Sequence, residues 1–133
     1  MAKTQTFQCS IVTPERVVLD CQARSVVFPA HDGELGVLRD RAPLVCKMGI
    51  GVARVEGEGG ERDFYVDGGF AQVVRNRLTI LTERAREAKD IDRAAVEKAM
   101  VEAKAMKIPD DAAFDARQKA LKRAEVQLKL VKR

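Results

Sequence analysis

The chain has 133 residues, of which 46% are apolar and 33% charged, and its formal net charge is +4. This length suits one domain, or one small domain with an appendage. The apolar content excludes a disordered chain, and no apolar run approaches the roughly 18 residues of a membrane-spanning helix. Three widely spaced cysteines (Cys9, Cys21 and Cys46) are an odd number, so we expect reduced thiols rather than a disulfide framework or a cysteine-based metal site.

The two halves of the chain differ in composition. All nine glycines lie at or before Gly69, whereas most alanines follow residue 84. Glycine and β-branched residues followed by Ala, Lys and Glu predict strands first and helices second. We therefore expect a boundary near residues 84–90, between a β domain at residues 1–86 and a helical segment at residues 87–133.

Short apolar or alternating segments recur along the first half, and tight-turn residues separate them. We expect strands at residues 7–12, 16–19, 24–29, 35–38, 44–48, 52–55, 63–66, 70–74 and 78–81. Gly-rich residues 57–60 and Arg-Asn-Arg at 75–77 predict hairpin turns. Many short strands with regular turns favour an antiparallel β-sandwich or barrel.

The second half predicts two helices. Asp90 is the expected N-cap of a helix that runs from Ile91 to about Met106, before Pro109. Asp110 or Asp111 is the expected cap of a second helix that continues to the C-terminus. The expected apolar faces comprise Ala95, Ala99, Met100, Ala103 and Met106 on the first helix, and Phe114, Leu121, Ala124, Leu128 and Val131 on the second. The fold class is therefore α+β, mainly β, with an antiparallel sandwich followed by an antiparallel two-helix hairpin.

Few residues suggest catalysis. His31 is the single histidine, which excludes a His-based triad or a His-pair metal site, and its loop context favours an ordinary loop residue. Neither a dinucleotide-binding glycine pattern nor a P-loop occurs. We expect no catalytic residue, no metal ion and no cofactor.

The second helix is basic. Between residues 113 and 133 it carries a net charge of +5, from Arg117, Lys119, Lys122, Arg123, Lys129, Lys132 and Arg133 against Asp115 and Glu125. This face is either simply solvated or binds an acidic partner. Nucleic acid is a weaker alternative, because the basic face lacks aromatic residues that stack on bases.

Several strings resemble one family. They are residues 11–18 (IVTPERVV), 29–38 (PAHDGELGVL), 41–44 (RAPL), 64–73 (FYVDGGFAQV) and 80–85 (ILTERA). These strings resemble the epsilon subunits of bacterial and chloroplast F-type ATP synthases, and the similarity runs from end to end of the chain.

The resemblance implies a sandwich of about ten strands and a non-catalytic subunit of the rotating central stalk. Such a subunit binds the gamma subunit and the c-ring, couples proton- or sodium-driven rotation to ATP synthesis, and inhibits ATP hydrolysis by extending its hairpin into the alpha/beta head. It implies a peripheral protein at the cytoplasmic face of the bacterial inner membrane, held there through the complex. The rival interpretation is a free-standing sandwich whose basic hairpin recruits an acidic protein.

The resemblance also implies sites. The rotor interface would include Glu34, Arg41 and Pro43, with Arg41 standing where the family commonly has His. The basic residues Arg117, Lys122, Arg123 and Lys129 would face an acidic segment of the beta subunit. Some relatives bind regulatory ATP; the corresponding residues here are Ile91, Asp92, Arg93 and Arg123, but the I-D-x-x-R-A motif is broken and Gln127 replaces a common arginine, so we do not expect ATP binding.

Overall fold

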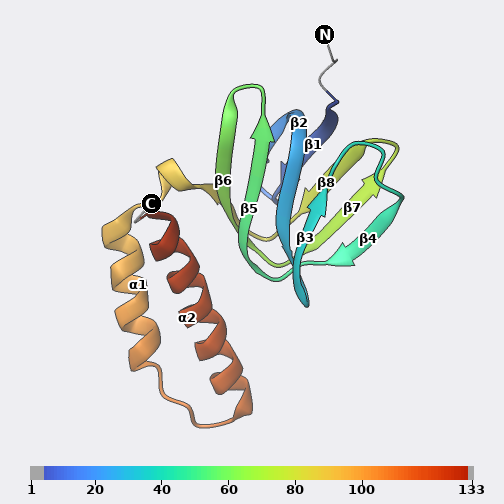
Figure 1. Cartoon of the computed structure of the whole chain (residues 1–133). Coiled ribbons are helices and arrows are strands. Elements are labelled where there is room, and N and C mark those ends of the chain that lie inside the picture. The colour runs from blue at the N-terminus through green and yellow to red at the C-terminus, as the bar shows by residue number, and fades with distance from the viewer. Residues whose placement is uncertain (1–4, 132–133) are drawn as a thin grey trace. The chain divides into compact units, whose positions relative to one another are not determined.

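A computed structural model describes residues 5–131. It divides after Glu87 into two compact units, which are described separately. Among the described residues the first unit contains nine strands (Figure 1): β1 Phe7–Val12, β2 Val17–Ala30, β3 Gly33–Val37, β4 Leu44–Lys47, β5 Ile50–Gly57, β6 Gly60–Asp67, β7 Phe70–Val74, β8 Arg77–Leu81 and β9 Ala85–Glu87.

The nine strands form one hydrogen-bonded sheet that folds into two layers. Its strand order is β4-β7-β8-β1-β2-β5-β6-β9, and β3 also pairs with β2. The long strand β2 joins the layers, because its first half pairs with β1 and its second half pairs with β3 and β5. All of these pairings are antiparallel except that of β1 with β8, which is parallel. The expected sandwich is confirmed.

The core lies between the layers and consists mainly of aliphatic side chains. Residues alternate between buried and partly exposed along β1, so that Phe7, Cys9 and Ile11 point inward. The largest fully buried side chains are Phe28, Phe64, Ile11, Leu78 and Ile80. Burial of each such side chain contributes about 1.5–3 kcal/mol to the free energy of folding. The core is therefore stabilised by aliphatic and phenylalanine side chains without tryptophan.

Two strands differ from the sequence expectation. Residues 16–19 and 24–29 were expected as separate strands but belong to the single strand β2, because the residues between them remain paired with β1. Strand β9 was not expected. Its three residues pair with β6, so its conformation depends on a partner distant in sequence rather than on a local pattern. The nine strands within residues 5–131 agree with the sandwich of about ten strands that the resemblance implied.

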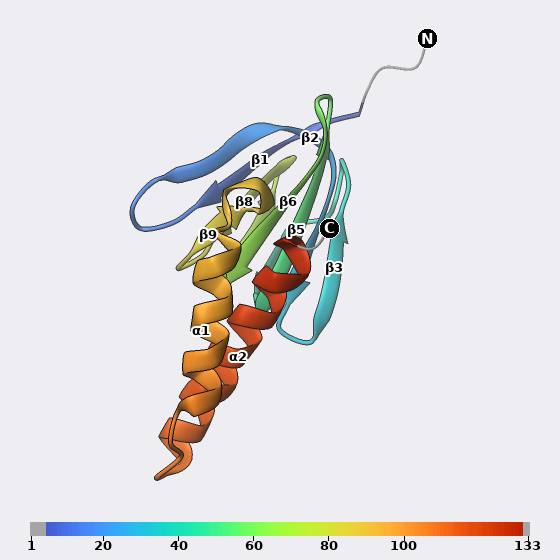
Figure 2. The ribbon, with the colours of Figure 1, turned by 90° about the vertical axis from the view of Figure 1, so that its left-hand side faces the viewer.

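The second unit is a helical hairpin. A short 3₁₀ helix, η1 (Ala88–Asp90), precedes α1 (Arg93–Ala105) and α2 (Asp111–Val131), and Figure 2 shows α1 and α2 side by side. Asp92, rather than the expected Asp90, caps α1, since its carboxylate accepts from the backbone N–H of Ala94 at 3.0 Å. The helix begins two residues later than expected because Asp90 belongs to η1.

At α2 the expectation of a capping aspartate is confirmed, and Asp110 is the residue that caps. Its Oδ1 accepts from the backbone N–H of Ala113 at 2.8 Å. No helix within residues 5–131 combines the length and the apolar character needed to cross a bilayer.

The expected apolar faces of the helices are only partly right. On α1, Ala103 is buried but Ala95 and Ala99 are exposed, and the buried residue near the start of the helix is Val96. On α2, Ala124 is buried, whereas Phe114 is 44% exposed. Alanine occurs on several faces of α1, so it marks the inner face poorly; the stripe formed by residues 96, 100 and 103 marks it better.

Candidate functional site

The expected rotor-interface residues lie at the two ends of β3. Glu34 is exposed near the start of this strand, where it pairs with Pro29 of β2. Arg41 and Pro43 are exposed in the connection from β3 to β4. At about 3.4 Å per residue, the strand alone puts roughly 10 Å between Glu34 and Val37, before that connection begins. The structure therefore places Arg41 and Pro43 together but does not bring Glu34 to them.

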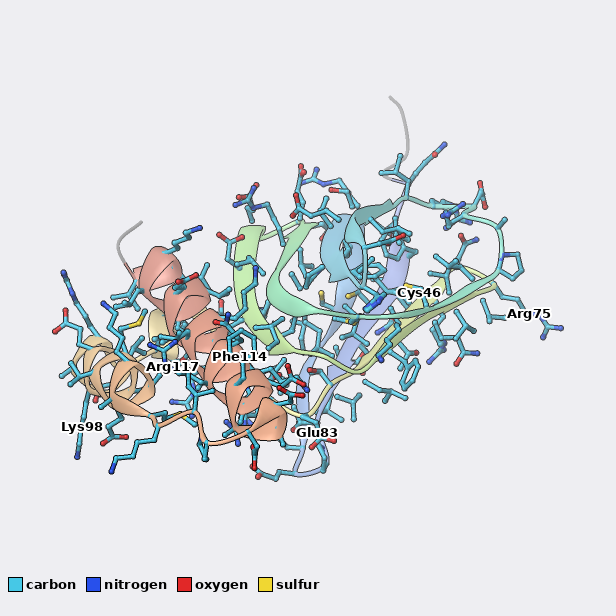
Figure 3. The ribbon with its side chains drawn as sticks, turned by 90° about the horizontal axis from the view of Figure 1, so that it is seen from below. Cys46, Arg75, Glu83, Lys98, Phe114 and Arg117 are labelled. Carbon is cyan, nitrogen blue, oxygen red and sulfur yellow. The ribbon has the colours of Figure 1, made fainter. Side chains whose placement is uncertain are left out.

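The connection that carries Arg41 is fixed to the turn between β7 and β8. The backbone N–H of Asp40 donates to Asn76 Oδ1 at 2.6 Å, and Asn76 Nδ2 donates to Asp40 Oδ1 at 3.2 Å. Arg75 and Asn76 both have positive φ, at 51° and 59°, as the tight turn of a hairpin requires. Figure 3 shows Arg75 projecting outward at this end of the sandwich. The reciprocal hydrogen bonds hold Arg41 beside a second loop.

An exposed apolar surface lies on β4, β7 and β8. Val45 of β4, Phe70 and Val74 of β7, and Leu81 of β8 are 67%, 55%, 37% and 50% exposed. Phe70 pairs directly with Leu81, so the two side chains lie on the same side of the sheet. We call these four residues the outer face.

The outer face was not singled out in the sequence, although a signal for it exists. In β7 and β8 the inward residues Ala71, Val73, Leu78 and Ile80 are buried, and apolar residues also occupy outward positions. A strand that packs on one side only normally carries polar residues on the other side. Several exposed apolar groups gathered on one side of a sheet in this way indicate contact with another protein.

Arg117 does not lie with the other basic residues of α2. Its Nη2 donates to the backbone carbonyl of Lys104, in the last turn of α1, at 3.3 Å. Its Nε is buried, with no hydrogen-bond partner. Figure 3 shows Arg117 on the side of α2 that faces α1, whereas Lys98 projects away. In the closed hairpin Arg117 therefore neutralises the negative end of α1.

Lys122 and Lys129 are exposed on a different face of α2. With 3.6 residues per turn they lie about 140° and 120° around the helix from Arg117, and nearly in line with each other. Arg123 is half-buried and lies about 120° around the helix from Arg117 in the opposite sense. The structure thus presents Lys122 and Lys129 together and separates Arg117 from them. Lys132 and Arg133 lie outside the described residues.

The expected nucleotide residues are already engaged within the hairpin. Ile91 is buried, and the Asp92 carboxylate caps α1. Arg93 Nε donates to Glu97 Oε1 at 3.0 Å, one turn further along the helix. Arg123 belongs to α2, well separated in sequence from these three. Over residues 5–131 no group of three or more His, Cys, Asp or Glu side chains is arranged to hold a metal ion.

Comparison with known proteins gives consistent results. The profile of the family described as "ATP synthase, Delta/Epsilon chain, beta-sandwich domain" matches residues 6–88. An "ATP synthase epsilon chain" of Rhodopirellula baltica is 39% identical over 124 residues, covering 93% of this chain and 97% of the relative. The "ATP synthase epsilon chain, sodium ion specific" of Propionigenium modestum is 31% identical over 127 residues, covering 94% and 93%.

Solved structures share the fold. A chain in the cryo-EM structure of the Euglena gracilis mitochondrial ATP synthase, OSCP/F1/c-ring, matches with a TM-score of 0.79 and 27% identity, covering 94% of this chain and 80% of that one. A chain of the Tetrahymena thermophila mitochondrial ATP synthase matches with a TM-score of 0.69 and 16% identity, covering 98% and 99%, which shows the fold alone. This chain therefore belongs to the family of ATP synthase epsilon chains.

Proposed function

We propose that the two units divide the work of a central-stalk subunit: the sandwich binds the other rotor subunits, and the hairpin restrains ATP hydrolysis. The chain is a non-catalytic subunit of the F1 part of a membrane-bound F-type ATP synthase, in which the beta subunits perform catalysis. The observation that carries the rotor role is the family match over the sandwich, together with a relative that is similar over nearly the whole chain. The rival free-standing module is not favoured.

The outer face is the proposed contact for the gamma subunit. Its apolar side chains come from three strands, with Phe70 beside Leu81 and the exposed Gln72 between Phe70 and Val74. Such a mixture of apolar and polar groups is typical of a protein interface. Glu34, Arg41 and Pro43 are the proposed contacts for the c-ring and its junction with gamma. Since Glu34 and Arg41 lie at opposite ends of β3, we treat them as two separate contacts.

The hairpin is the proposed brake on hydrolysis. Lys122 and Lys129 are exposed while α1 and α2 are packed together in the closed hairpin. They can therefore contact an acidic segment of the beta subunit before the hairpin opens. Arg117 reaches such a segment only after its hydrogen bond to Lys104 breaks. Arg123 is half-buried and makes a smaller contribution. Regulatory ATP is left out of this proposal, because capping and ion pairing already engage Asp92 and Arg93.

We place the protein at the cytoplasmic face of a bacterial plasma membrane, bound only through its complex with gamma, the c-ring and the alpha/beta head. Co-purification tests this placement. The chain should be recovered from membranes with these subunits at moderate salt. Recovery only as a separate species with unrelated partners would remove the rotor role.

The brake is tested by ATP hydrolysis and synthesis assays on assembled complexes over a salt series. Lys122→Ala combined with Lys129→Ala should raise hydrolysis by up to about 30-fold, since exposed ion pairs contribute about 0–1 kcal/mol each and about 1 kcal/mol changes a population about fivefold. Arg117→Ala alone should change hydrolysis less than the lysine pair, because it removes a hydrogen bond of the closed hairpin as well as a contact of the extended form. Lys98→Ala with Lys107→Ala removes the same charge outside α2 and is the control. Equal effects of the control and the α2 pair would contradict an electrostatic brake.

A further inference from the structure

Two of the three cysteines face each other across adjacent strands. Cys9 of β1 pairs directly with Cys21 of β2 in the antiparallel ladder. The neighbouring pairs on the same side are Ile11 with Leu19 and Phe7 with Ala23, and all four of these residues are buried. Because directly opposite residues project from the same side of a sheet, both thiols lie on the core side.

The backbone spacing at this pair suits a disulfide. Directly opposite residues in antiparallel strands have Cα atoms about 4.5–5.5 Å apart, and disulfides span Cα separations of about 4.4–6.8 Å. The ladder is regular here, since its register shift falls between Ile11 and Val12. The general Cα spacing of such a ladder therefore lies within the range that a disulfide spans.

The two thiols differ in access. Cys9 is fully buried, whereas Cys21 is half-buried and lines a surface pocket of about 260 Å³. The β5–β6 hairpin forms the opposite wall of this pocket, with Val55, Gly57 and Arg62 among the lining residues. A reagent can therefore reach Cys21 first and Cys9 only through Cys21.

We propose that Cys9 and Cys21 form an oxidisable dithiol that takes low-molecular-weight disulfides as its substrate class. The Cys21 thiolate attacks one sulfur of the small disulfide, which forms a mixed disulfide and releases one thiolate that takes up a proton. The Cys9 thiolate then attacks the Cys21 sulfur, releasing the second thiolate. Two protein thiols are oxidised to one disulfide, and the small disulfide is reduced to two thiols.

The surroundings make this reaction slow. Burial raises the pKa of both thiols, with Asp20 adding to the increase and the positive charge of Arg62 opposing it at Cys21. Thiolate is the attacking species, so little of either thiol reacts at neutral pH. The pair thus responds to sustained oxidation rather than to a brief pulse. Cys46 cannot form the same crosslink across strands, because the residue opposite it on β7 is Ala71.

The test uses the full-length Cys46→Ser protein with oxidised glutathione at about pH 8.5. Free thiols are counted after denaturation, and the crosslink is located by peptide mapping. We expect both remaining thiols to be lost and a Cys9–Cys21 peptide to appear. When Cys9→Ala is added to Cys46→Ser, a glutathione adduct should accumulate on Cys21. When Cys21→Ala is added instead, the remaining thiol of Cys9 should be lost at least tenfold more slowly than the thiols of the Cys46→Ser protein.

Two results would overturn the proposal. One is a crosslink in Cys46→Ser that forms only when denaturant is present, since the native register would then play no part. The other is equal thiol loss in Cys9→Ala and Cys21→Ala, since access through Cys21 would then be wrong. Cys46 is only half-buried at the margin of the core, whereas Cys9 is fully buried. The result with Cys46→Ser therefore stands even if an alanine variant at Cys9 folds poorly.

Discussion

Gly69 lies where the chain turns from β6 into β7, inside one of the strings that identify the family. Its φ is +97°, a conformation that side chains rarely adopt. A Cβ atom built there would lie 1.9 Å from the carbonyl oxygen of Leu81 and 2.8 Å from Cα of Thr82. Both obstacles belong to the backbone, so they cannot move aside as the end of a flexible side chain can. The close approach of two strands at this point depends on the missing side chain.

Gly69→Ala should therefore lower the free energy of unfolding by at least about 3 kcal/mol, from backbone strain and the clash together. Gly59→Ala is the matched control, because nothing lies within 4 Å of its Cβ position and its φ is outside the strained range. The control should stay within about 0.5 kcal/mol of the unaltered protein in urea unfolding. Similar losses in both variants would show that the clash is relieved in solution.

The buried thiol of Cys9 gives a dependence of stability on pH. Burial raises its pKa from 9.0 to about 12. Between these values the unfolded chain has lost the proton and the folded chain retains it, so stability is complete below about pH 9 and falls as pH rises. The slope is about 1.4 kcal/mol per pH unit. Cys9→Ala should show a shallower fall than the unaltered protein in urea midpoints at pH 8, 9 and 10; parallel curves would contradict this assignment.

Arg117 shows what residue type alone does not decide. In the sequence it is one of four basic residues of the second helix, together with Lys122, Arg123 and Lys129, and all four do carry positive charge on α2. The role of Arg117 depends on the direction in which it projects from α2, which a count of charges does not include. It depends also on α1, whose last turn presents the Lys104 carbonyl as an acceptor. The same holds for Glu34 and Arg41, which are close in sequence but lie toward opposite ends of an extended strand.

At the scale of elements, the start of α1 depends on Asp92. Its Oδ1 lies 3.0 Å from the N–H of Ala94 and 3.5 Å from that of Ala95, two groups with no partner within the helix. Asp92→Ala should destabilise the hairpin by about 1 kcal/mol. Asp90→Ala removes a nearby acid that makes no such contact and should have little effect. Helix content followed by circular dichroism during thermal unfolding distinguishes the two, and equal losses would mean that charge rather than capping matters.

Most elements could be predicted from local pattern, because alternation marks the short strands and the change to helical spacing marks the hairpin. The exceptions depend on tertiary pairing. Strand β9 has only three residues and exists through its ladder with β6. Strand β2 crosses from one layer to the other within 14 residues, so its two halves resemble separate strands in sequence. The outer face was missed for a related reason. The other layer of the sandwich covers the side of β7 that carries Ala71 and Val73, and Phe70 lies on the opposite, exposed side, which the local sequence does not reveal.

For the whole molecule, the end of the sandwich is marked by an ion pair. Arg62 of β6 donates to both carboxylate oxygens of Glu87, at 2.9 and 2.7 Å, and its guanidinium lies 5.3 Å from the ring centroid of Phe64. Bidentate pairs of this kind fix geometry as well as charge. They fasten β9 to β6 at the last residue of the first unit. We therefore propose Glu87, one residue beyond the expected 1–86 domain, as the natural end of the independent sandwich.

Truncation tests this boundary and the division of function together. Residues 1–87 should unfold in a single cooperative transition, because the core lies within the sandwich layers. Residues 1–84 lack β9 and should be less stable by about 1–3 kcal/mol, since β6 loses its edge partner and Ala85 its place against the core. Glu87→Gln within residues 1–87 isolates the ion pair and should cost less than about 1 kcal/mol, as Arg62 is partly exposed.

In assembled complexes, residues 1–87 should support rotation-coupled ATP synthesis while ATP hydrolysis rises, because the contact surface for the rotor is kept and the hairpin is lost. The measurement compares both activities with those of complexes that contain the full chain. Loss of synthesis with residues 1–87 would show that the hairpin contributes to the rotor contact. Unchanged hydrolysis would show that the hairpin does not restrain this enzyme, and the exposed lysines of α2 would then be a solvated surface.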